Sequence, residues 1–192
     1  MKKHLITILL LAVAMPALAD DAKVPAHPYV EIDTTEGIIR LELEGRRAPL
    51  TVGNFLKLID SGYYDGTVFH RVIPGFMIQG GGYTPNLKVK EPDGAIPNES
   101  GNGLQNLRGT IAMARLGEPH TANAQFFINV SDNKSLDPKP ERWGYTVFGY
   151  VIEGMDVVDK IAAMRTGPGG QFSKDVPVIP VVIKKLSRYE FE

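Results

Sequence analysis

The middle of this 192-residue chain is built from short apolar runs that glycine, proline and asparagine interrupt repeatedly. Runs of this length do not suit long helices, and their spacing is typical of the short strands of a β-sandwich or a closed β-barrel. The pattern therefore predicts a mostly β fold. The clearest runs cover residues 67–73, 110–114, 125–130 and 146–151.

The segments on either side of this region have different periodicities. Residues 29–43 alternate between apolar and polar around a glycine turn, which predicts a hairpin. Residues 48–62 and 155–164 carry apolar side chains at helical spacing, which predicts two helices. A final strand is expected over residues 176–186, and its two prolines place the start of that strand at a sheet edge.

The first 19 residues have the pattern of a secretory signal peptide. Lys2 and Lys3 provide the positive start, residues 5–13 form an apolar stretch, and Ala17-Leu18-Ala19 matches a signal-peptidase site. The apolar stretch is well short of the roughly 20 residues that a membrane-spanning helix needs. We expect cleavage after Ala19 and a mature chain without a membrane segment.

The mature chain is expected to comprise a short leader, residues 20–28, and one domain, residues 29–192. It contains no cysteine, which excludes disulfides, thiol nucleophiles and thiolate metal sites. Loss of Lys2 and Lys3 leaves 19 basic residues against 22 acidic ones, and hence a net charge of −3. A mildly acidic chain without a basic stripe is a poor candidate for nucleic-acid binding.

Two segments could place polar and apolar side chains on one face of the predicted sheet. Because strand side chains alternate between faces, Arg71, Met77 and Gln79 share a face if the turn between them keeps the register. In a second strand, Gln125 and Phe127 share a face. Phe126 and Ile128 lie on the opposite face and are expected to point into the core.

These residues allow two interpretations. An apolar floor of Phe76, Met77 and Phe127 beside an arginine and two glutamines is a plausible site for a small ligand. Alternatively, all of them are ordinary sheet residues, with Arg71 exposed and Phe76 in the core. The alternation of side chains alone does not decide between the two.

A resemblance to a known family favours the first interpretation. Residues 69–81, FHRVIPGFMIQGG, closely resemble the signature segment of the cyclophilins. Residues 125–128, QFFI, and residues 147–155, VFGYVIEGM, are similar to two further family segments, and the match runs in order from about residue 29 to 186. The chain is thus identified as a cyclophilin-type peptidyl-prolyl cis-trans isomerase. Together with the signal peptide, it is most similar to the periplasmic bacterial branch.

The resemblance implies a closed eight-stranded antiparallel β-barrel capped by two α-helices, with the proline site on the outer surface. It also implies a monomeric periplasmic enzyme that rotates X-Pro bonds in exported polypeptides without a covalent intermediate, metal or cofactor. The competing function is a binding module that binds proline-containing segments without isomerising them. The presence of Arg71 in its family context favours the enzyme.

The resemblance also assigns roles to individual positions. Arg71 is the catalytic arginine, and the three apolar side chains named above form the pocket for the proline ring. The two glutamines bind the substrate or hold the arginine, and the strand at Ala114 pairs with the substrate backbone. The implied substrate-binding residues are Phe76, Met77, Gln79, Ala114, Arg115, Gln125, Phe127, Leu136 and Tyr145.

Three positions depart from the family pattern. Arg115 stands where the family usually has asparagine, which leaves its backbone role intact and its side-chain role open. Tyr145 replaces a pocket histidine and can keep an aromatic wall with a polar tip. Ser135 falls at the tryptophan that binds cyclosporin, and serine cannot replace an indole. We therefore expect weak or no cyclosporin binding, with Trp143 as a local packing residue that could compensate only in part.

Overall fold

The computed structural model describes residues 24–90, 92 and 94–190. The signal peptide predicted at residues 1–19 and the first four residues of the predicted leader lie outside this described part. Within it, no helix is both long and apolar enough to cross a membrane.

The described chain folds into β-strands with two α-helices and one short 3-10 helix, η1. Both predicted helices are present, and each is a few residues shorter than expected. The elements, in chain order, are β1 (Tyr29–Thr34), β2 (Gly37–Leu43), α1 (Pro49–Asp60), β3 (Phe69–Ile73), β4 (Met77–Gly80), β5 (Thr110–Met113), β6 (Phe126–Asn129), η1 (Lys134–Leu136), β7 (Val147–Glu153), α2 (Met155–Ala162), β8 (Thr166–Gly169), β9 (Phe172–Pro177) and β10 (Ile183–Tyr189).

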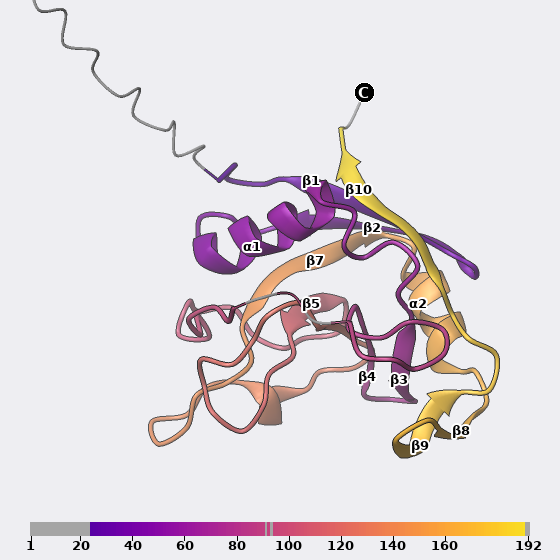
Figure 1. The fold of residues 1–192 in the computed structure, drawn as a ribbon. Coiled ribbons are helices and arrows are strands. Elements are labelled where there is room, and N and C mark those ends of the chain that lie inside the picture. Colours follow the sequence, from indigo (N-terminus) through magenta and orange to yellow (C-terminus); the bar gives the residue numbers. More distant parts are fainter. Residues whose placement is uncertain (1–23, 91, 93, 191–192) are drawn as a thin grey trace, which may run out of the picture.

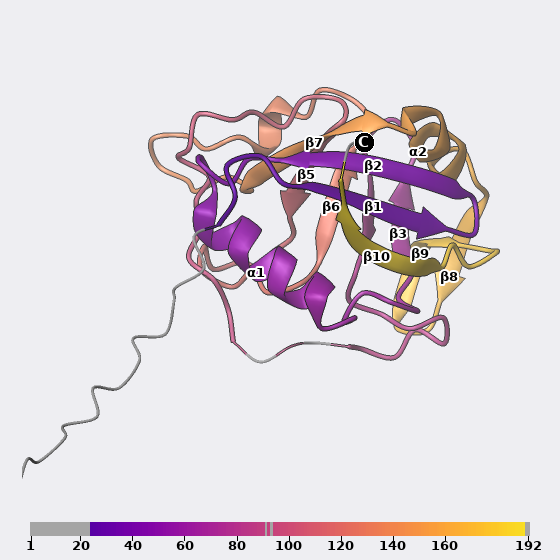
Figure 2. The same ribbon diagram turned by 90° about the horizontal axis from the view of Figure 1, so that it is seen from above.

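Eight of these strands form one antiparallel sheet in the order β10-β1-β2-β7-β5-β6-β4-β3, and β8 pairs with β9 in a separate hairpin. The sheet curls so that its two halves face each other, and α1 and α2 lie at opposite ends of the curl (Figures 1 and 2). The prediction of a closed barrel is wrong, because the strand ladder ends at β10 and β3 and leaves an open half-barrel.

The chain before β10 explains why the sheet stays open. The final strand predicted over residues 176–186 is instead two strands, with β9 ending at Pro177 and β10 beginning at Ile183. Pro180 lies between them and has no N–H to donate to a ladder. In the described part of the chain, β3 and β10 therefore share no ladder, and the residues just before them, Val68 and Val182, form an isolated bridge.

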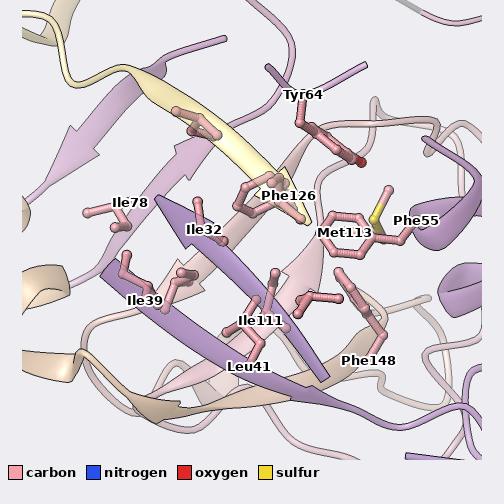
Figure 3. Packing of buried hydrophobic residues seen from close by; sticks show 14 of the residues in the cluster. Ile32, Ile39, Leu41, Phe55, Tyr64, Ile78, Ile111, Met113, Phe126 and Phe148 are labelled. Carbon is pink, nitrogen blue, oxygen red and sulfur yellow. The ribbon is translucent and has the colours of Figure 1, made fainter. Parts of the chain in front are cut away.

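Buried side chains lie on both faces of β4, β5, β6 and β7. The larger set, which we call the inner cluster, fills the space between the two halves of the sheet and includes Ile78, Ile111 and Phe126 (Figure 3). The alternate residues of the same strands form a second set on the opposite face, here called the outer cluster. Its buried members are Met77, Ala112, Phe127 and Val147.

Helix α1 receives its N-terminal cap from a distant loop. Ala48 stands at the N-cap position and has no side chain that could accept a hydrogen bond. The Glu99 carboxylate accepts hydrogen bonds from the backbone N–H of Leu50 at 3.1 Å and of Thr51 at 2.8 Å, and from the Thr51 hydroxyl at 2.6 Å. These contacts satisfy free N–H groups of the first turn and place a negative charge at the positive end of the helix.

Replacing Glu99 with alanine should therefore lower the free energy of unfolding by about 1–2 kcal/mol, the usual effect of losing a helix cap. Urea denaturation of the two proteins measures the difference. Glu141→Ala, which removes an exposed carboxylate from another loop, is the matched control and should have little effect. Equal stabilities for the Glu99 and Glu141 variants would contradict the assigned cap.

Candidate active site

The pairing of five strands places one row of side chains across the outer face of the sheet. Arg71 on β3 pairs with Gln79 on β4, and Gln79 pairs with Phe127 on β6. Phe127 in turn pairs with Ala112 on β5, which pairs with Val147 on β7. Directly paired residues point to the same face of a sheet. The register therefore brings an arginine and a glutamine to the border of the outer cluster.

A small apolar hollow of about 60 Å³ opens beside this row. Tyr145 and Phe127 form one side of it, with their ring centroids 5.7 Å apart and their planes nearly perpendicular. Phe76 is half-buried against the outer cluster and does not lie in the inner core, so the alternative of an ordinary core residue is wrong. The hollow is lined by Arg71, Phe76, Met77, Gln79, Phe127, Leu136 and Tyr145.

The guanidinium of Arg71 is held by a chain of two glutamines. Its Nη1 donates to Oε1 of Gln79 at 3.3 Å, and Nε2 of Gln79 donates to Oε1 of Gln125 at 3.1 Å. Among the described residues, no other group accepts a hydrogen bond from this guanidinium. Arg71 is half-buried and lines the apolar hollow.

A glycine keeps the last glutamine of this chain in place. A Cβ atom on Gly82 would lie 2.4 Å from Cγ of Gln125, far closer than two carbon atoms that are not bonded to each other can approach. The Gln125 side chain thus packs directly on the backbone of residue 82.

A larger groove of about 370 Å³ adjoins the hollow and shares Arg71, Gln79 and Tyr145 with it. Ala114, Arg115 and Gln125 border this groove, so every residue predicted for the site lies along one of the two depressions. Several other lining residues were not predicted from the sequence, because they come from loops and from β9, where no local pattern marks them. These are Tyr83, Leu116, Thr121, Asn123 and Phe172.

His70 lies in the wall of the groove next to Arg71. His70 has no pairing partner on β4, because the register of β3 against β4 shifts between Phe69 and Arg71. The centroid of its ring lies 4.4 Å from that of the Tyr83 ring. Burial lowers the pKa of His70 to about 4, and the charge of Arg71 acts in the same direction, while the Val68 carbonyl opposes the change. His70 is therefore neutral at neutral pH.

Comparison with known proteins decides the family. Residues 29–188 match the family model described as cyclophilin type peptidyl-prolyl cis-trans isomerase/CLD. The chain belongs to this family. It is an enzyme, a cyclophilin-type peptidyl-prolyl cis-trans isomerase.

Individual relatives are similar over nearly their whole length. Peptidyl-prolyl cis-trans isomerase cyp18 of Streptomyces antibioticus is 54% identical over 158 residues, which cover 81% of this chain and 95% of the relative. Peptidyl-prolyl cis-trans isomerase A of Dickeya dadantii is 43% identical over 184 residues, or 96% of each chain.

Solved structures agree with the fold. A crystal structure of a cyclophilin-type isomerase from Cryptosporidium parvum has a TM-score of 0.70 and 28% identity, and the match covers 86% of this chain and 99% of that one. A second structure of the same protein, determined in the presence of the dipeptide Ala-Pro, has a TM-score of 0.68 with 85% and 99% coverage.

Within this cyclophilin, Gly82→Ala should lower isomerase kcat/KM by about tenfold, because the new methyl group displaces Gln125 and breaks the chain that holds Arg71. A protease-coupled assay on a proline tetrapeptide measures the change. Gly101→Ala is the matched control, since a Cβ atom there meets nothing within 4 Å. Unchanged activity in Gly82→Ala, with the fold intact, would show that Gln125 does not position the arginine.

The buried neutral histidine predicts a specific acid sensitivity. The pKa of His70 is about 4 in the folded chain and about 6.5 when unfolded, so the unfolded chain takes up this proton first as the pH falls. The contribution of His70 to the free energy of unfolding is therefore fully present above about pH 6.5. It decreases as the pH falls towards 4, by up to about 3 kcal/mol.

Urea denaturation at pH 7 and pH 4 should show that His70→Gln loses less stability on acidification than the wild type. An identical pH dependence in both proteins would contradict the buried neutral state of His70.

Proposed function

We propose that Arg71 catalyses rotation by stabilising the twisted X-Pro amide. Resonance gives the peptide C–N bond partial double character and a rotation barrier of about 18–20 kcal/mol. As the bond twists, the proline nitrogen regains its lone pair and becomes a hydrogen-bond acceptor. A fixed cationic donor beside that nitrogen therefore binds the twisted amide better than either planar form, which is the condition for catalysis.

The position of Arg71 is the observation that carries this proposal. Its guanidinium borders the apolar hollow, is held on one side by Gln79, and keeps its other donors free of partners in the described chain. Raising a rate on the order of 0.01 s⁻¹ to about 10³ s⁻¹ requires roughly 7 kcal/mol of transition-state stabilisation. A charge-assisted hydrogen bond in a partly dry site, together with fixed positioning, is of the right size.

In this proposal the apolar hollow holds the proline ring while the chain on one side of the bond rotates. Phe76, Met77 and Phe127 form its floor, and Leu136 and Tyr145 form its wall. A shallow site of this kind suits a single ring and little more. The related structure determined in the presence of Ala-Pro supports a proline-containing ligand for the family fold.

The substrate backbone pairs, in the same proposal, with residues 114–115, which directly follow the end of β5. The backbone N–H of Ala114 is already used within the fold, because it donates to the Gln125 carbonyl at 2.8 Å. In the part of the chain that the structure describes, the backbone N–H and C=O of Arg115 make no hydrogen bond. Such free edge groups suit the addition of an extended peptide strand.

We further propose that the clients are unfolded or folding exported proteins and that the enzyme acts as a periplasmic monomer after cleavage at Ala19. The signal-peptide pattern of the sequence supports the location. The chemistry itself makes and breaks no covalent bond, so no cofactor or metal is required.

Ser135 is exposed on η1 and offers no large apolar surface, which supports weak or no cyclosporin binding.

Arg71→Ala should lower kcat/KM for a proline tetrapeptide by about 10²–10³-fold, the usual loss when one preorganised transition-state donor is removed. Arg71→Lys keeps the charge but loses the planar fork and should recover only part of the activity. Far-UV and near-UV circular dichroism check that both variants stay folded.

The same assay separates the enzyme from the binding module. A folded Arg71→Ala protein that still binds the peptide but turns it over slowly supports the assigned role. A folded Arg71→Ala protein with wild-type turnover would overturn it. A wild-type chain that binds the peptide without accelerating its isomerisation would favour the binding module.

A further inference from the structure

The side chain of Arg115 makes four hydrogen bonds to backbone carbonyls of its own chain. Its Nη1 donates to the carbonyls of Leu116 at 2.9 Å and Gly117 at 3.0 Å. On the other side, Nε donates to the Gly144 carbonyl at 3.2 Å and Nη2 to the Trp143 carbonyl at 2.8 Å. The guanidinium thus ties residues 115–117 to residues 143–144.

The same guanidinium lies over the ring of Tyr145. The Arg115 Cζ atom is 4.7 Å from the centroid of that ring, which is within the range of a cation–π contact. Tyr145 contacts Phe127 edge-on, and its backbone N–H donates to the Leu136 carbonyl at 3.0 Å. Tyr145 therefore lies between Arg115 and the apolar hollow, and it forms the wall through which Arg115 can influence that hollow.

A guanidinium that makes four hydrogen bonds to carbonyls has little capacity left for a ligand, because it carries only five N–H donors. We propose that Arg115 is a positioning residue, which fixes residues 143–145 so that Tyr145 is held against Phe127 as the wall of the proline pocket. Arg115 thus acts on the substrate through Tyr145. This inference rests on the proposed proline site and assigns a role to the one side chain there that the family resemblance left open.

The arrangement depends on the shape of the guanidinium as well as its charge. The planar guanidinium of Arg115 has donors on both edges, so it can bind carbonyls on two separate segments at once. Its flat face remains available to stack on the ring of Tyr145. A lysine ammonium can keep the charge but cannot bridge both segments and stack on Tyr145 in the same way. The proposal therefore predicts that Arg115→Lys weakens peptide binding as much as Arg115→Ala does.

The fold should survive the loss of Arg115, because groups that do not line the groove also hold the same segment. Nδ2 of Asn98 donates to the Gly144 carbonyl at 3.0 Å, and the Gly144 N–H donates to Oγ of Ser100 at 3.1 Å. Trp143 also packs on His120, with ring centroids 5.3 Å apart. Removing Arg115 should loosen the pocket side of the segment and leave its attachment to the rest of the fold.

The test compares Arg115→Lys and Arg115→Ala with the wild type in two readouts on the full mature chain. The first is the equilibrium Kd of a proline tetrapeptide, measured by NMR titration, and the second is the split of isomerase activity into kcat and KM. Both variants should raise Kd and KM by about five- to tenfold while kcat stays within about twofold, since only the pocket wall is altered. The emission of Trp143, the single tryptophan in the sequence, should shift in both.

Arg108→Ala is the matched control. Arg108 also bonds a backbone carbonyl, that of Val130, and forms an ion pair with Asp159, but it lines neither depression. Its loss should leave Kd, KM and Trp143 emission unchanged.

A double-mutant cycle with Tyr145→Leu tests whether Arg115 acts through Tyr145. In that background, Arg115→Lys should cause no further rise in Kd, because residues that act in one unit are not additive. Recovery of wild-type Kd by Arg115→Lys, or equal effects of Arg115→Lys with and without Tyr145, would overturn the positioning role. If the wild type did not accelerate isomerisation, the proposed function would be contradicted. The positioning role of Arg115 would still be tested, because the Kd measurement does not depend on turnover.

Discussion

Strand β6 is buried on both of its faces, and the rest of the structure depends on this constraint. Phe126 and Ile128 pack into the inner cluster, while Phe127 between them packs into the outer cluster. A slip of one residue would exchange the two faces and bury neither set correctly. The register of β6 against β4 is therefore fixed, and with it the row that leads from Phe127 through Gln79 to Arg71.

The chemistry of the family requires little beyond this row. In the proposed mechanism, rotation about an X-Pro bond needs an apolar place for the ring and one fixed donor beside the nitrogen. We propose that the outer cluster provides the first and the half-buried Arg71 the second. The histidine next to Arg71 is neutral because burial lowers its pKa to about 4, so it adds no second titrating charge near neutral pH.

The sequence predicted those features that follow from local alternation or from contiguous motifs. The opposed faces of Phe126 and Phe127, the two helices and the grouping of the site residues belong to this class. The open sheet was not predictable in this way, because it depends on where two distant edges meet beside Pro180. The Glu99 cap lies 49 positions from the Leu50 N–H that it binds, and two of the carbonyls around Arg115 belong to a second loop. Each contact has a backbone group as one partner, and backbone groups carry no residue-type signal, so only the folded chain reveals these contacts.

A pair of methionines on opposite faces allows the most direct measurement of where the substrate binds. Met77 belongs to the outer cluster and Met113 to the inner one, and both are at most 2% exposed. In a ¹³C-methyl-methionine NMR titration with a proline tetrapeptide, the Met77 methyl signal should shift and saturate while that of Met113 stays nearly unchanged. A saturable shift of Met113 as large as that of Met77, or no shift of Met77 at saturation, would contradict a proline site on the outer face.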